Sequence, residues 1–217
     1  MMAQSDIEKA EKLFGEKKFT AAIPNFENVL ETDPNNEKIL ERIGDCYGQL
    51  KIWDKSLVYY KKLKIQKPKN ADYWYKYGGA LGMKAKESNR FVALGLIGDI
   101  KKSFEYAVVL NPKHIDARWA LVELYLQLPG IIGGSETKAA RYANELSQLS
   151  AVDGYLAKAR ISDYFDRLKT SEKNYILAHQ TGNSALTYQK LYDFYIKKMK
   201  DRSKAEKLQA QFNQNKS

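Results

Sequence analysis

Three prolines divide the first half of the chain at nearly regular intervals. Pro34 and Pro68 are 34 residues apart, and Pro112 follows 44 residues later. An aromatic residue lies eight positions before each proline, and a small or apolar residue lies four positions before that aromatic. The aromatic residues are Phe26, Tyr60 and Phe104, and their partners are Ala22, Ser56 and Ile100. Residues four apart share one helix face, and proline cannot continue a helix interior. Each interval therefore predicts a helix that ends shortly before its proline.

A second helix in each repeat is predicted from glycines that precede a large side chain by three positions. Gly44 precedes Tyr47, and Gly78 precedes Leu81 in a segment that Trp74 begins. Glycine inside a helix costs about 1 kcal/mol relative to alanine. Its presence at both positions predicts close contact with a neighbouring helix.

These residues resemble the tetratricopeptide repeat (TPR) family, most specifically from Asp6 to Pro112. The resemblance implies an all-α fold, a right-handed α-solenoid of about five to six antiparallel helix hairpins in a single domain. A disordered start or tag remnant is expected at 1–5 and a frayed tail at 213–217. The expected hairpins are 6–36, 37–70, 71–114, 115–151, 152–183 and 184–212.

Two insertions depart from the 34-residue step. The third hairpin contains the apolar segment 91–98, so it is either longer or has an extended turn. The fourth contains a glycine-rich loop at 128–135, which resembles a bacterial TPR subfamily with a Pro-Gly-Ile-Ile-Gly-Gly sequence. We expect a tight turn in which Ile131 and Ile132 fill the gap between hairpins. The alternative is an anion site on the backbone amides of the loop. Its candidate residues are Gly133, Gly134 and Ser135.

Composition excludes several kinds of site. One cysteine and two histidines rule out an internal disulfide, a Cys-based zinc site and most transition-metal sites, so neither a metal nor a cofactor is expected. Cys46 is expected to be a packing residue, and neither histidine has a catalytic partner at a motif spacing, so no enzyme is predicted. The net charge is +10, but the lysines are spread along the chain, which favours solvated faces over nucleic-acid binding. The segment 91–98 is too short to span a membrane.

The resemblance implies that a peptide or protein binds the concave face formed by the first helix of each hairpin. The candidate residues on that face are Asp45, Gln49, Tyr75, Gly79, Trp119, Glu123, Gln127, Lys158 and Phe165. Aromatic and acidic side chains together favour a partly apolar, basic peptide. Alternatively, Tyr75, Trp119 and Phe165 pack between hairpins. The TPR subclass that binds a terminal carboxylate uses Lys and Asn on the exposed side of these first helices. The corresponding residues here are Glu11, Asp45, Gly79 and Glu123. Binding of an acidic tail through its terminal carboxylate is therefore disfavoured, because like charges would face each other.

The predicted function is a scaffold or adaptor without catalysis, whose partner is another protein or peptide, and whose chain is a monomer or a weak homo-oligomer. The alternative is a periplasmic small-ligand carrier or transporter accessory, with a pocket formed by the extended third hairpin and the 128–135 loop. A nucleic-acid binder and a self-associating structural protein are further hypotheses. Ala3-Gln4 resembles the end of a removed signal peptide, which slightly favours an exported, periplasmic protein over a cytoplasmic one.

Overall fold

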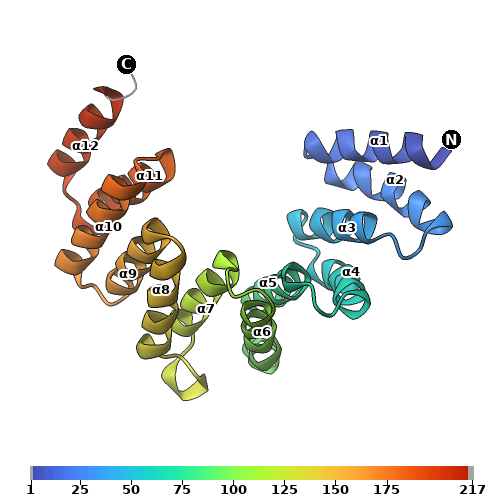
Figure 1. Cartoon of the computed structure of the whole chain (residues 1–217), viewed down its shortest axis with the longest axis horizontal. Helices are drawn as coiled ribbons and strands as arrows, with labels where there is room; N and C mark the ends of the chain where they lie inside the picture. Colours follow the sequence, from blue (N-terminus) through green and yellow to red (C-terminus); the bar gives the residue numbers. More distant parts are fainter. Residues whose placement is uncertain (1, 215–217) are drawn as a thin grey trace. The chain divides into compact units, whose positions relative to one another are not determined.

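The structure, a computed structural model, describes residues 2–214, with side chains from Asp6 onward. This part of the chain contains helices and no strand. It divides into two compact units whose boundary lies between Ala117 and Arg118. Within each unit the helices pack as antiparallel hairpins (Figure 1). The all-α solenoid fold of helical hairpins is confirmed, whereas the single-domain organisation stays a prediction.

The first unit contains three hairpins, each made of two consecutive helices. They are α1 (Met2–Gly15) with α2 (Phe19–Thr32), α3 (Glu37–Gln49) with α4 (Trp53–Gln66), and α5 (Ala71–Glu87) with α6 (Arg90–Leu110). The first of these helices begins inside the expected 1–5 start, and Met1 lies outside the described residues. The ten residues added to the third repeat lengthen both of its helices. The third hairpin is therefore longer and does not have an extended turn.

The second unit continues the same pattern, and α7 contains the boundary between the units. Its helices are α7 (Ile115–Gln127), a 3-10 turn (Gly130–Ile132), α8 (Glu136–Leu149), α9 (Ala151–Tyr164), α10 (Leu168–Gly182), α11 (Ala185–Asp193), a π-helical segment (Phe194–Met199) and α12 (Arg202–Gln214). The last helix ends inside the expected 213–217 tail, of which residues 215–217 lie outside the described part.

The residues that predicted the repeat are the residues that pack the hairpins. Phe26, Tyr60 and Phe104 are buried, and so are the small or apolar residues four positions before them. A Cβ at Gly44 would lie 2.7 Å from the Tyr60 ring, and a Cβ at Gly78 would lie 2.9 Å from Ser103 Cβ. The expected close helix contact at both glycines is confirmed.

Short polar side chains set the starts of several helices. Asn36 and Asn70 accept hydrogen bonds from the first backbone amides of α3 and α5. Ser135, Ser150 and Ser184 do the same for α8, α9 and α11. Such caps satisfy amides that have no partner inside the helix. Ser135 is thus the N-cap of α8.

The glycine-rich loop is a tight turn, but its isoleucines do not fill a gap. Gly133 has a φ of 104°, and a Cβ at Gly134 would lie 1.7 Å from the Leu128 carbonyl oxygen, so the turn requires both glycines. Ile131 is 91% exposed, and Ile132 is only half-buried. The expectation that the two isoleucines plug the space between hairpins is wrong for Ile131, because the 3-10 turn directs that side chain into solvent.

Candidate peptide-binding surface

The nine candidate residues divide between the two units. Asp45 and Gln49 lie on α3, and Tyr75 and Gly79 lie on α5, all in the first unit. The remaining candidates lie in the second unit. Trp119, Glu123 and Gln127 lie on α7, Lys158 lies on α9, and Phe165 is the C-cap of α9. Each unit therefore offers its own surface.

On the first unit, the acidic candidate Asp45 is already engaged. Its Oδ1 accepts a 2.6 Å hydrogen bond from the Tyr60 hydroxyl and a 2.7 Å bond from Lys76 Nζ. Lys76 also forms a 2.6 Å ion pair with Glu41. Burial works against the charge on Lys76, but its two carboxylate partners raise its pKa overall. Asp45 therefore fastens α3 to α4 and α5.

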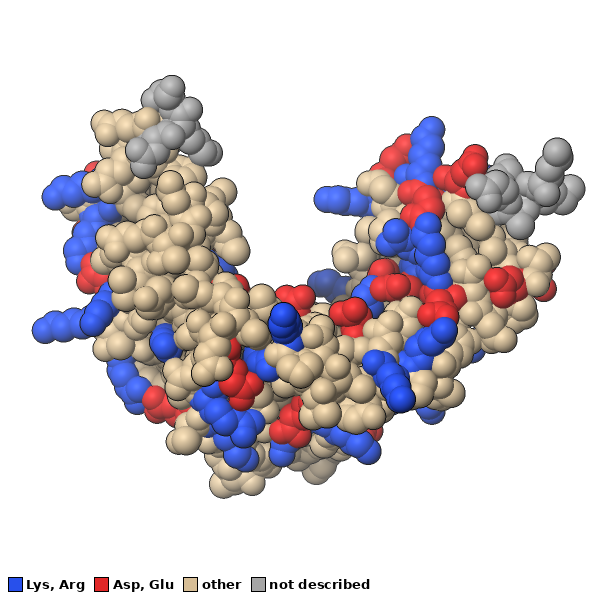
Figure 2. All heavy atoms as spheres, in the orientation of Figure 1, with Lys and Arg blue, Asp and Glu red and all other residues tan. Residues whose placement is uncertain are grey.

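Acidic and basic side chains interleave over the part of the surface that holds α1 to α4 (Figure 2). Glu11 of α1 pairs in the same way with Arg42 of α3, at 3.1 Å. Because Glu11 and Asp45 already have cationic partners, these two carboxylates are less available to a basic peptide.

The other candidates on α3 and α5 have different surroundings. The Tyr75 ring is half-buried and lies 5.0 Å from the His114 ring and 5.9 Å from the Phe104 ring, centroid to centroid. These contacts favour the alternative in which Tyr75 packs between helices. Gln49 is exposed, and a Cβ at Gly79 would meet no atom within 4 Å.

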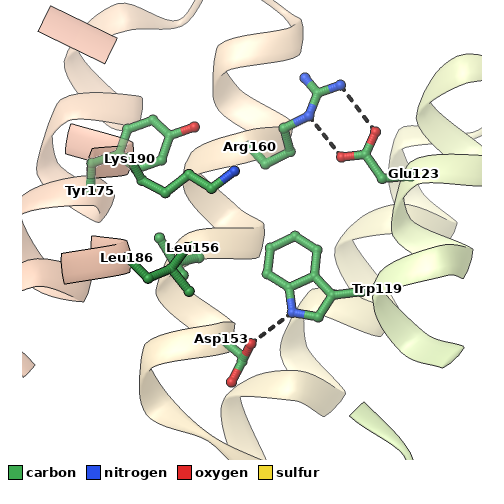
Figure 3. A pocket seen from close by; sticks show the side chains of 8 residues that line it. All are labelled: Trp119, Glu123, Asp153, Leu156, Arg160, Tyr175, Leu186 and Lys190. Carbon is green, nitrogen blue, oxygen red and sulfur yellow. Dashed lines mark hydrogen bonds and ion pairs between the residues drawn. The ribbon is translucent and has the colours of Figure 1, made fainter. Parts of the chain in front are cut away.

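On the second unit, side chains from α7, α9, α10 and α11 surround a pocket of about 290 Å³ (Figure 3). Two of the candidates, Trp119 and Glu123, form part of its wall. The other lining residues are Asp153, Leu156, Arg160, Tyr175, Leu186 and Lys190. Leu156 and Tyr175 are buried, while Leu186 and Lys190 at the α11 side are exposed.

Two polar contacts hold the walls of this pocket in place. The Trp119 indole N–H donates a 2.8 Å hydrogen bond to Asp153 Oδ1. Arg160 donates from Nε to Glu123 Oε1 at 2.8 Å and from Nη2 to Oε2 at 3.1 Å. This two-point geometry fixes the planes of both side chains and keeps the Arg160 guanidinium charged. The indole and guanidinium therefore have fixed orientations before any ligand arrives.

The pocket lining carries two acidic and two basic side chains, and one acidic and one basic side chain are paired with each other. Glu123 is compensated by Arg160, and Asp153 accepts the indole hydrogen bond. Lys190 forms no ion pair with any residue that the structure describes. Burial raises the pKa of the Tyr175 hydroxyl to about 12, so this phenol is neutral at physiological pH. The ammonium of Lys190 and the carboxylate of Asp153 are the two charges of the lining without an ion-pair partner among the described residues, and Lys190 is the exposed one beside Leu186.

The remaining candidates of the second unit do not line the pocket. Gln127 is exposed and donates to Glu123 at 2.9 Å. Lys158 is half-buried on α9. Phe165 ends α9 and contacts the Tyr164 ring and the Arg167 guanidinium.

The three candidate amides of the glycine-rich loop all donate hydrogen bonds within the chain. Gly133 donates to the Gly130 carbonyl, Gly134 to the Pro129 carbonyl and Ser135 to the Tyr125 carbonyl. The Ser135 hydroxyl oxygen accepts from the Lys138 amide. The anion-site alternative at Gly133, Gly134 and Ser135 therefore lacks the free backbone amides on which it depends. Neither this loop nor the 91–98 segment lines the pocket of the second unit, so the ligand-carrier hypothesis gains no support.

Sequence reasoning missed most of the pocket. It placed Trp119 and Glu123 on the binding face but not Asp153 and Arg160, which lie 34 and 37 residues later and contact them. That offset of about one repeat is the signal that could have found both residues. No motif marks Leu186 or Lys190 in the sequence.

Other chemistry has little basis among residues 2–214. No group of three or more His, Cys, Asp or Glu side chains there could hold a metal ion, and no described helix is long and apolar enough to cross a membrane. Cys46 is buried, and burial raises the pKa of its thiol to about 12. The protonated thiol, which is a poor nucleophile, therefore dominates at physiological pH.

Comparison with known proteins agrees with the fold. The tetratricopeptide repeat family model matches residues 13–78. A solved structure of MamA protein is 17% identical, with 91% of this chain and 96% of that chain covered at a TM-score of 0.62. A thermophilic TPR protein of Thermus thermophilus is 16% identical, with 96% and 99% covered at a TM-score of 0.66.

A third structure, of YrrB, described as a TPR protein with an unusual peptide-binding site, is 15% identical, with 84% and 87% covered at a TM-score of 0.56. No curated protein sequence matches the chain. None of these comparisons supports the subfamily suggested by the Pro-Gly-Ile-Ile-Gly-Gly loop. The chain therefore has the fold of the tetratricopeptide repeat proteins, and the family model supports the same family over residues 13–78.

Proposed function

We propose that this protein is a binding scaffold that holds a segment of a partner protein against the pocket of its second unit. The observation that carries the proposal is the pocket itself, in which Trp119, Leu156 and Leu186 offer apolar surface next to the exposed ammonium of Lys190. Apolar surface supplies affinity, and a few placed polar groups supply orientation. The peptide-binding description of the YrrB structure is consistent with such a role.

The chemistry of the pocket favours a partner segment with an apolar side chain beside an acidic one. The apolar group would lie against Trp119 and Leu186, and the carboxylate would pair with Lys190. This differs from the basic peptide suggested by the sequence, because Glu123 and Asp153 are already engaged by Arg160 and Trp119. The proposal assigns no catalytic step to any residue.

Photo-crosslinking at Leu186 tests this proposal. Leu186 is 60% exposed beside the pocket, and Ile65 on α4 is 65% exposed and serves as the matched control. A photo-reactive phenylalanine analogue at position 186 should capture a defined protein in source cells, whereas the same analogue at position 65 should not. The captured peptide, identified by mass spectrometry, should contain an acidic residue near an apolar one.

A change in the charge of Lys190 provides a second test of the proposal. Adding Lys190→Glu to the position-186 probe should reduce capture about tenfold, because a like charge then faces the partner carboxylate. Equal capture at positions 186 and 65, or capture unaffected by Lys190→Glu, would show that the partner binds elsewhere.

A further inference from the structure

Two turns of the second unit expose apolar side chains to solvent. Ile131, in the 3-10 turn between α7 and α8, is 91% exposed. Tyr164, Phe165 and Leu168 surround the turn between α9 and α10, and each of them is exposed as well. Residues 128–135 of the first turn carry no charge. Exposed apolar patches of this kind mark interaction surfaces with proteins or membranes.

The two turns lie next to each other at one edge of the unit. α7 and α9 run in the same direction, because α8 returns antiparallel between them in the chain (Figure 1). Arg167, which follows α9, donates a 2.9 Å hydrogen bond from Nη2 to Oε2 of Glu136, the first residue of α8. This contact joins the second turn to the end of the first. The exposed apolar side chains and the first turns of α8 and α10 therefore form one surface, termed here the turn edge.

The carboxylates of the turn edge already have cationic partners. Glu136 forms its ion pair with Arg167. Lys198 Nζ lies 3.4 Å from Asp163 Oδ1 and 3.1 Å from Asp166 Oδ1. These three acidic side chains therefore present little uncompensated negative charge to an approaching anionic surface.

Two lysines of the same edge lack an anionic partner. Lys138 and Lys169 are exposed in the first turns of α8 and α10, and neither forms an ion pair with a residue that the structure describes. The Lys138 ammonium lies 5.4 Å from the centroid of the Tyr125 ring, a contact that orients it without neutralising its charge. Positive charge next to exposed apolar side chains is the combination that binds an anionic lipid surface.

The backbone of the first turn suits an interface with lipid. The amides of Ile132 and Gly133 donate to the carbonyls of Pro129 and Gly130. Pro129 itself has no amide hydrogen. An amide that is hydrogen-bonded within the chain can leave water at little cost, whereas an unpaired amide cannot. The turn can therefore carry Ile131 into the interface without leaving these amides unpaired.

We propose that the turn edge binds the surface of a lipid bilayer that contains anionic headgroups. Ile131, Phe165 and Leu168 enter the interface, and Lys138 and Lys169 pair with the headgroup phosphates. The side chains enter only the boundary between headgroups and acyl chains, as in proteins that lie on a membrane without spanning it.

This function goes beyond the capture of a partner segment, and it leaves the pocket free. Trp119 and Asp153, which form part of the pocket wall, lie near the N-terminal ends of α7 and α9. The turn edge lies at the C-terminal ends of the same two helices. Tyr164 lies about 16 Å farther along α9 than Asp153. The second unit can therefore bind a partner while it lies on a bilayer.

Co-sedimentation of the full chain with lipid vesicles tests the proposal. Vesicles of phosphatidylcholine with about 30% phosphatidylglycerol should bind the chain about tenfold more tightly than vesicles of phosphatidylcholine alone. Ile131→Ser should weaken binding to the anionic vesicles about tenfold, because an apolar side chain no longer enters the interface. The change leaves the fold intact, since the Ile131 side chain is exposed. Val109→Ser, at a 70% exposed position on α6 of the first unit, is the matched control and should bind as the wild type does.

Two further measurements separate charge from insertion. Lys138→Glu combined with Lys169→Glu should weaken binding to the anionic vesicles about tenfold or more, whereas replacement of both lysines by arginine should preserve it. An environment-sensitive fluorophore on Ile131→Cys should shift its emission to the blue on anionic vesicles, and the same label on Val109→Cys should not.

A chain that does not bind the anionic vesicles would overturn the proposal. So would binding that Ile131→Ser leaves unchanged, or a label at position 131 that stays in water while the chain is bound. Capture of an acidic protein at the turn edge by a chain that binds no vesicle would assign this surface to a protein partner instead.

Discussion

On α5, Gly78 and Gly82 lie about one turn apart but have different surroundings. A Cβ at Gly78 would lie 2.9 Å from Ser103 Cβ and 3.0 Å from the Phe104 ring, whereas a Cβ at Gly82 would meet no atom within 4 Å. The first glycine permits α5 and α6 to touch. The second has no packing role within the described chain.

We therefore expect opposite effects from the same substitution. Gly78→Ala should lower the free energy of unfolding by about 1–3 kcal/mol, because the added methyl group overpacks the contact with α6. Gly82→Ala should raise it by up to about 1 kcal/mol, because alanine favours the helix. Urea unfolding followed by circular dichroism measures both. Shifts of equal sign and size would contradict the close contact at Gly78.

At the scale of the element, the two helices of a hairpin are joined by a turn that forces one residue into the left-handed region. Lys17, Lys51 and Asp166 have φ values of 60°, 60° and 53°. Each is the second residue after the end of the first helix of its hairpin. Such values are unfavourable for residues other than glycine. The turn therefore holds a residue other than glycine in an unfavourable backbone conformation. The side chain of that residue does not help to form the turn.

Lys51→Gly should relieve this strain and raise the free energy of unfolding by about 0.5–1 kcal/mol. The matched control is Lys61→Gly on the exposed side of α4, where the backbone is helical and glycine should instead cost about 1 kcal/mol. Thermal unfolding midpoints of the two variants should move in opposite directions. A lower midpoint for Lys51→Gly would show that loss of the lysine outweighs the relief of strain.

Helix positions could be predicted from the sequence because their causes are local. A proline such as Pro68 and a cap such as Asn70 act within a few residues of the helix end that they set. The close contacts at Gly44 and Gly78 were also predicted correctly, because each glycine precedes a large apolar or aromatic residue at the repeat's spacing, whereas Gly82 does not meet any neighbour.

The pocket could not be predicted because it depends on contacts between repeats. Asp45 and Glu123 are acidic residues on the expected face, but the sequence alone does not show that Lys76 and Arg160 neutralise them. The role of Lys190 could be inferred only from the structure, which places it at the pocket and pairs Glu123 with Arg160. The exposure of Ile131 was missed for a related reason, because it depends on the direction of the 3-10 turn rather than on hydrophobicity.

At the scale of the whole molecule, opposite charges that lie about one repeat apart join successive hairpins within each unit. The partners are 30–37 residues apart along the chain. In the first unit they are Glu11–Arg42, Asp45–Lys76 and Asp54–Lys84, and in the second Glu123–Arg160, Glu136–Arg167, Asp166–Lys198 and Glu172–Lys204. Because a repeat places equivalent positions side by side, a charge pattern offset by one repeat becomes a series of ion pairs.

This series makes stability depend on pH in the acid range. Burial alone would raise the pKa of Glu11, but hydrogen bonds and charges from Arg42 and Lys38 lower it below the ordinary value of 4.5. Between those two values the unfolded chain binds more protons than the folded one. Stability from this pair is therefore complete above about pH 4.5 and is lost as pH falls toward the lower, folded pKa.

The difference in unfolding free energy between wild type and Glu11→Gln isolates this contribution, because the other carboxylates titrate in both proteins. We expect a constant difference from about pH 7 to about pH 5 and a smaller one near pH 3, where Glu11 of the wild type becomes protonated as well. Urea unfolding at each pH measures it. A difference that stays constant down to pH 3 would mean that Arg42 and Lys38 do not lower the pKa of Glu11 in the folded chain.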